Sequence, residues 1–121
     1  MKTFSTLSIA TLTTWLLVTG CSKQPIVDYG EGYWLAQDRG VVVYSSSYCY
    51  YYVVQTNYGY TVIGSVDGYR PFEGDVIYGN FSNYGVRDYY DRSSGVITSG
   101  NVREYWLSYA DAQQAITYYC H

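Results

Sequence analysis

The chain has 121 residues, of which 7 are Lys or Arg, 10 are Asp or Glu and one is His, so its formal net charge is −3 at pH 7. This length provides for one small domain. The basic residues are scattered, which excludes nucleic acid as a partner and makes anionic membrane surfaces poor partners.

The first 21 residues have the organisation of a processed export signal. One positive charge at Lys2 precedes an uncharged, largely apolar run over residues 4–18, and Val18-Thr19-Gly20-Cys21 follows it. This segment resembles the lipobox of bacterial lipoprotein signal peptides. The resemblance implies that residues 1–20 are a cleaved signal peptide and that Cys21 becomes the lipidated N-terminus. An uncleaved anchor and cleavage without lipid are the alternatives, although the run is shorter than the ~20 residues of a spanning helix.

The same resemblance implies a location and a partner. Two or more acyl chains hold a protein stably on a bilayer, so a membrane is the expected partner through the N-terminal lipid. Ser22 follows the cysteine, and by analogy with enterobacterial lipoproteins it favours the outer membrane, facing the periplasm. We therefore expect a protein of the bacterial cell envelope, with residues 21–31 as a lipidated tether and residues 32–121 as the folded domain.

The remaining two cysteines predict a disulfide. Cys49 and Cys120 are an even pair in a compartment that oxidises thiols. A bridge between them closes a loop of about seventy residues, for which the chain-entropy model gives ~4 kcal/mol of stabilisation. The alternative is two free thiols, as metal ligands beside His121, but no CxxC or HxxxH spacing accompanies them. We expect no metal and no cofactor.

After the tether, short β-branched and aromatic runs alternate with glycine-containing turns, which is typical of antiparallel β structure. Strands are predicted over residues 41–44 and 50–56. Asn57-Tyr58-Gly59 fits a three-residue hairpin loop with glycine in the left-handed conformation. That loop pairs Thr56 with Tyr60, Val54 with Val62, Tyr52 with Gly64 and Tyr50 with Val66, all on the core face. Tyr52 would then cover the bare backbone of Gly64.

Residues 75–81 and 86–91 predict a second hairpin, whose register the sequence leaves open because apolar residues fall on both faces. Two more strands are expected over 96–98 and 102–107. Ser108 then caps a helix over 108–119, with Ala112, Ala115, Ile116 and Tyr119 as its apolar stripe. The predicted fold is mainly β: a small antiparallel barrel-like or strongly bent sheet of five to six strands, with one C-terminal helix over an opening.

Catalysis is not expected. The single histidine, His121, ends the chain, so no Ser–His–acid or Cys–His arrangement forms around it. The neighbouring carboxylates Asp88 and Asp91, and Glu73 and Asp75, are typical of solvated turns. The segment 67–75 could hold calcium through three carboxylates, but its spacing matches no EF-hand loop, and a polar turn is favoured.

Tyrosine is unusually abundant, with 18 residues, all after Cys21. Tyrosine side chains are common in binding surfaces because they cover a large area with few rotors. Packing in a small core is the alternative role, and it suits Tyr50, Tyr52 and Tyr60. The candidate ligand-binding residues are therefore those at turns and beside the tether: Tyr58, Tyr69, Tyr84 and Trp34.

We therefore expect a non-enzymatic envelope lipoprotein whose tyrosine-rich β domain binds a protein partner or a cell-wall glycan of the peptidoglycan type. The alternative is a proteinaceous inhibitor of a periplasmic or host hydrolase such as a lysozyme. Lipid-anchored lysozyme inhibitors are similar to this chain in size, β-rich build and cysteine usage.

Overall fold

The computed structural model describes residues 30–121. The expected signal peptide, Cys21 and most of the tether lie outside these residues. The chain divides into two units between Tyr33 and Trp34. The first helix, α1 (Glu31–Leu35), crosses this division and was not predicted. The remaining elements are β1 (Asp38–Ser46), β2 (Cys49–Thr56), β3 (Gly59–Ser65), β4 (Val76–Gly79), β5 (Gly85–Asp91), β6 (Val96–Leu107) and α2 (Tyr109–Tyr119).

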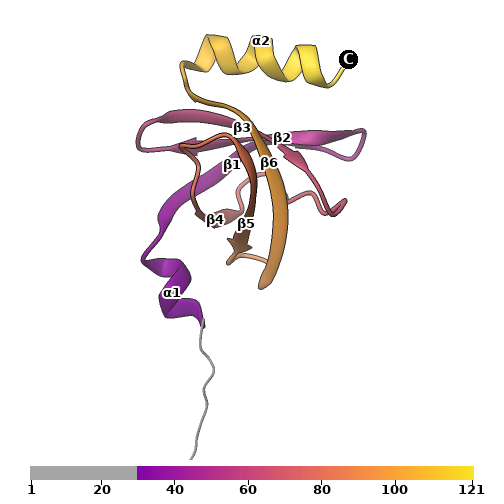
Figure 1. Cartoon of the computed structure of the whole chain (residues 1–121). Helices are drawn as coiled ribbons and strands as arrows, with labels where there is room; N and C mark the ends of the chain where they lie inside the picture. Colours follow the sequence, from indigo (N-terminus) through magenta and orange to yellow (C-terminus); the bar gives the residue numbers. More distant parts are fainter. Residues whose placement is uncertain (1–29) are drawn as a thin grey trace, which may run out of the picture. The chain divides into compact units, whose positions relative to one another are not determined.

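The six strands form a closed antiparallel barrel in the order β1-β2-β3-β6-β5-β4 (Figure 1). The pairing of β1 with β4, from Asp38 opposite Gly79 to Val41 opposite Val76, closes it. The interior is filled by the buried side chains of Val42, Tyr52, Val54, Ile63, Ile77, Phe81, Tyr89 and Val102. The predicted class, a small mainly β barrel with a C-terminal helix, is confirmed.

The last strand is continuous, whereas two separate strands were predicted there. β6 runs for 12 residues, and its middle pairs on both sides, with Gly100 opposite Ser65 of β3 and opposite Arg87 of β5. Gly100 faces the interior, where a Cβ atom would overlap the side chain of Ile63. Glycine is therefore a packing requirement at this position and not a turn signal.

The predicted register of the β2–β3 hairpin is wrong by one residue. Thr56 pairs with Gly59 and closes a two-residue turn, in which the Thr56 hydroxyl donates to the carbonyl of Gly59. A slip of one residue moves every side chain of a strand to the opposite face. Ile63 therefore lies inside the barrel and Val62 outside it.

The slip also changes the positions of the tyrosines. Tyr51, not Tyr52, lies over Gly64, and Tyr52 is buried inside the barrel as predicted. Tyr50 is 57% exposed, and Tyr60 packs outside the barrel with the residues of α2. Both faces of the hairpin are apolar because α2 covers the outer one, so hydrophobic alternation could not fix the register.

α2 packs against the outer wall of the barrel, and not over an opening as predicted. The Ser108 hydroxyl accepts a hydrogen bond from the amide of Asp111 at 3.1 Å and caps the helix as expected. Ala112, Ala115 and Ile116 are buried, and they pack against Val53 of β2 and Val62 of β3. The predicted apolar stripe is thus confirmed, with Tyr119 partly buried beside it.

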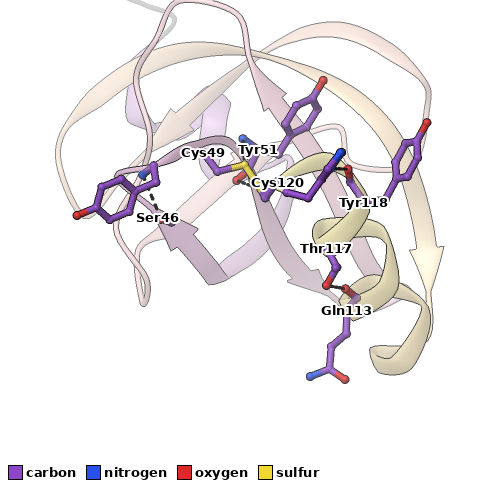
Figure 2. Close-up of a disulfide and its surroundings, with 9 residues drawn as sticks. Ser46, Cys49, Tyr51, Gln113, Thr117, Tyr118 and Cys120 are labelled. Atoms are coloured by element: carbon purple, nitrogen blue, oxygen red, sulfur yellow. Dashed lines mark hydrogen bonds between the residues drawn. A yellow bond between two sulfur atoms is a disulfide. The ribbon is translucent and has the colours of Figure 1, made fainter.

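A disulfide joins Cys49, the first residue of β2, to Cys120, which follows α2 (Figure 2). The two Cα atoms are 5.5 Å apart, and the cysteines are separated by 71 positions in the chain. The ring of Tyr51 stacks on that of Tyr119 beside the bridge, with 4.7 Å between the centroids. The predicted pairing is confirmed, and it attaches the end of the helix to the barrel.

Candidate functional site

Four aromatic side chains lie in contact at the end of the barrel that carries the β2–β3 turn, and we call them the aromatic row. The ring centroids of Tyr58 and Trp106 are 5.8 Å apart, those of Trp106 and Tyr105 5.7 Å, and those of Tyr105 and Tyr84 4.8 Å. Tyr58, Trp106 and Tyr84 are 61, 58 and 65% exposed, whereas Tyr105 packs partly against the core. Exposed aromatic rings gathered in this way are typical of binding surfaces.

A bulge in β6 places Trp106 in this row. Tyr60 pairs with Leu107 and Val62 with Glu104, so β6 has one residue more than β3 over this stretch. Trp106 has φ 60°, and it is the only non-glycine residue with positive φ among residues 30–121. A tryptophan in this conformation is strained by about 1–3 kcal/mol, which the surrounding structure must offset. Strain and bulges of this kind concentrate at functional sites.

Contacts with two other segments hold the tryptophan in place. Its indole Nε1 donates a hydrogen bond to the Ser82 hydroxyl at 2.8 Å, which fixes the ring against the β4–β5 loop. Gly59 of the β2–β3 turn lies so close that a Cβ atom there would be 2.8 Å from the carbonyl oxygen of Leu107. The strained backbone of β6 is thus confined by a neighbouring glycine, and the exposed ring face is preorganised.

Two of the segments around the row carry no charged side chain, whereas Arg103 and Glu104 directly precede Tyr105 in β6. Residues 55–66, which include the β2–β3 turn, and residues 76–86, which include the β4–β5 loop, contain no Asp, Glu, Lys, Arg or His. They offer hydroxyl and amide groups instead, among them those of Asn57, Ser82 and Asn83. This end of the barrel therefore combines apolar ring faces with neutral hydrogen-bonding groups.

The row includes two of the four predicted binding residues, Tyr58 and Tyr84. Tyr69 lies outside the row and is only partly exposed, and its hydroxyl donates a hydrogen bond to the carboxylate of Asp91. The ring of Trp34 lies 6.2 Å from that of Tyr90, outside the row. Tyr105 and Trp106 were not predicted as site residues. The signal available for them was Tyr105-Trp106-Leu107, a break in strand alternation that is typical of a bulge.

A second polar cluster surrounds Asp91 at the end of β5. Asp91 is fully buried, and its carboxylate accepts hydrogen bonds from the Tyr69 hydroxyl at 2.8 Å and the Ser94 amide at 3.1 Å. Burial, together with a hydrogen bond to the carboxyl of Asp75, raises the pKa of Asp91 to about 6. The carboxylate of Asp67 is held by Thr98 and by the Ser99 amide, which lower its pKa, while its desolvation acts in the opposite direction.

Asp91→Asn is expected to stabilise the domain above pH 6. The folded protein retains a proton on Asp91 up to about pH 6, whereas an unfolded aspartate releases it near pH 4. The contribution of Asp91 to the free energy of unfolding is thus highest below about pH 4. It falls as the pH rises to 6 and stays low above that pH. Asparagine removes the buried charge, so the free energy of unfolding should rise by about 1–2 kcal/mol at pH 8 and not at pH 4.

The measurement is thermal unfolding between pH 4 and pH 8. Asp88→Asn is the matched control, since Asp88 is an exposed carboxylate of the same strand that accepts a hydrogen bond from Ser99. An equal gain in the free energy of unfolding of Asp91→Asn at pH 4 and at pH 8 would show that the charge of Asp91 does not destabilise the folded domain.

Within residues 30–121, no group of three or more His, Cys, Asp or Glu side chains is placed to hold a metal ion. Neither helix of this described region is both long and apolar enough to cross a bilayer.

No protein-family model, curated protein or solved structure matches the chain. The fold and the site define a six-stranded antiparallel barrel with an exposed aromatic row.

Proposed function

We propose that this protein is a non-enzymatic lipoprotein of the bacterial cell envelope, anchored through Cys21, whose domain binds a protein partner or a cell-wall glycan. The observation that carries the binding role is the exposure of Tyr58, Trp106 and Tyr84 in one connected row. The motif that carries the anchor is Val18-Thr19-Gly20-Cys21.

The row has the properties of a recognition surface. An indole and several phenol rings provide a large contact area at a low cost in conformational entropy. Exposure of this area to water is unfavourable by roughly 25 cal/mol per Å² of apolar surface, so a ligand that covers it gains binding energy. The strained backbone at Trp106 adds support, because packing alone gives no reason to turn this ring toward solvent.

The test is capture of the partner by the native lipoprotein. Crosslinking in cells, followed by identification of the co-purified proteins, examines the protein-partner role, and sedimentation with purified sacculi examines the glycan role. Specific retention in either assay, lost when Trp106 is replaced, supports the proposal. Recovery of a hydrolase that the protein inhibits would favour the inhibitor function instead. Recovery of neither protein nor sacculi above background would contradict binding.

Cys21→Ala is expected to abolish acylation. Cells grown with a radioactive fatty acid should label the wild-type protein and leave the variant unlabelled, because the thiol is the expected point of attachment. Ser22→Ala is the control, since it should keep its label. Equal labelling of the wild-type and Cys21→Ala proteins would refute the anchor.

A further inference from the structure

One guanidinium lies beside the aromatic row, and no carboxylate within residues 30–121 bonds to it. Arg87 is partly buried, and its Nη2 atom donates to the carbonyl oxygen of Tyr84, a member of the row, at a long 3.4 Å. Its Nε atom is buried and has no hydrogen-bond partner in the described part of the chain. A buried donor without a partner is unfavourable. Since the Nε atom is enclosed, an incoming group would contact the Nη end of this partly exposed side chain.

The position of Arg87 follows from the alternation along β5. Tyr89 and Asp91 are buried inside the barrel, and Arg87 is on the same face of the strand, nearer to the end that carries the row. Its charge is close enough to Tyr89 to oppose the rise in that residue's pKa that burial causes. Asp88, its neighbour in sequence, alternates to the other face and bonds to Ser99.

We propose that the aromatic row and Arg87 together form a binding site for a pyranose oligosaccharide that carries a carboxylate. This rests on the proposed binding function and names its ligand class. The apolar faces of sugar rings stack on Trp106 and Tyr58, while the guanidinium binds the carboxylate through charge-assisted hydrogen bonds. The hydroxyl and amide groups of residues 55–59 and 80–83 suit the uncharged remainder of the sugar.

Charge complementarity favours this ligand over a neutral one. The chain has a net charge of −3, so its overall field repels anions, and a guanidinium beside the row is a local exception. Two other arginines are placed differently: Arg70 lies over the ring of Tyr50 and Arg103 over that of Tyr119, at 4.5 and 5.4 Å from the centroids. Neither contacts the row, so each can serve as a control.

The experiment compares two glycans with the same backbone. Peptidoglycan strands freed of their peptides carry a lactyl carboxylate on every second sugar, whereas a chitooligosaccharide of equal length has none. The full-length protein in detergent should bind the carboxylated strand about tenfold more tightly at low salt, as expected for one charge-assisted contact. Arg87→Gln should remove this preference and retain binding of the chitooligosaccharide, and Arg87→Lys should restore part of it.

Arg103→Gln is the matched control and should leave the preference unchanged. Thermal unfolding verifies that each variant is folded. Equal binding of the two glycans by the wild-type protein, or a preference that persists in Arg87→Gln, overturns the carboxylate inference and leaves the binding function intact. Binding of neither glycan by the wild-type protein, together with retention of a crosslinked protein partner, assigns the row to a protein and overturns the inference as well.

Discussion

Replacement of both Cys49 and Cys120 by serine is expected to cost this domain about 4 kcal/mol of stability. The bridge closes a 71-residue separation, and a loop of that length removes much of the freedom of the unfolded chain. For a domain of about 90 residues, the loss corresponds to a fall in Tm of roughly 20 °C. Chemical denaturation under non-reducing conditions provides the free energy, and far-UV circular dichroism reports whether α2 remains formed.

The redox state supplies the control for this result. Reduction of the wild-type protein should lower its midpoint to that of the double variant, while the variant itself should not respond to reductant. The buried contacts of Ala115 and Ile116 with the outer wall persist in both proteins, so the difference isolates the covalent link. A double variant as stable as the oxidised wild-type protein would contradict a stabilising role for the bridge.

Trp106→Ala is expected to reduce ligand retention by at least tenfold, the scale on which a central aromatic residue acts in a binding site. The substitution removes the indole that links Tyr58 to Tyr105, so the row loses its continuity. Stability should fall modestly, because alanine keeps the positive φ and loses the hydrogen bond to Ser82, whereas the ring itself is mostly exposed. The measurement is co-sedimentation with sacculi, or the yield of the crosslinked partner, at matched protein concentration.

Tyr48→Ala provides the comparison for a non-specific loss of aromatic surface. Tyr48 is 97% exposed on the β1–β2 turn, which lies away from the row. Its removal should leave retention unchanged. Equal losses in the Tyr48→Ala and Trp106→Ala proteins would indicate that binding reflects general stickiness of the many tyrosines and has no defined site.

Most of the fold could be predicted because the preferences of neighbouring residues in the sequence match the elements that they form in the structure. The β-branched and aromatic run at 50–56 forms β2, and the serine before the amphipathic stripe at 109–119 caps α2. The even pair of cysteines forms the bridge. In these cases the residue types restrict both the backbone and the face that is buried, so neighbouring residues are sufficient evidence.

The register of the first hairpin and the continuity of β6 could not be predicted, because each depends on a partner distant in sequence. Val62 lies on the outer face of the sheet and is buried there by α2. Thr61 is a polar residue that is nevertheless buried, and its hydroxyl donates a hydrogen bond to the carbonyl of Phe81 at 3.0 Å. In the sequence, Gly100 is typical of a turn, but in the structure it is a strand residue where a Cβ atom would overlap the side chain of Ile63. A pattern of hydrophobic residues does not reveal which element will cover the second face of a sheet.

Residue type and spacing along the chain were sufficient to predict the class of fold, the cysteine pairing, the capped helix and two exposed turn tyrosines. They could not predict that Tyr58 and Tyr84 belong to one row, because Tyr105 and Trp106 of β6 lie between them. In the folded domain, Tyr69 and Trp34 lie outside that surface. Barrel closure brings residues 58, 84 and 106 to the same end, and no spacing along the chain encodes that proximity.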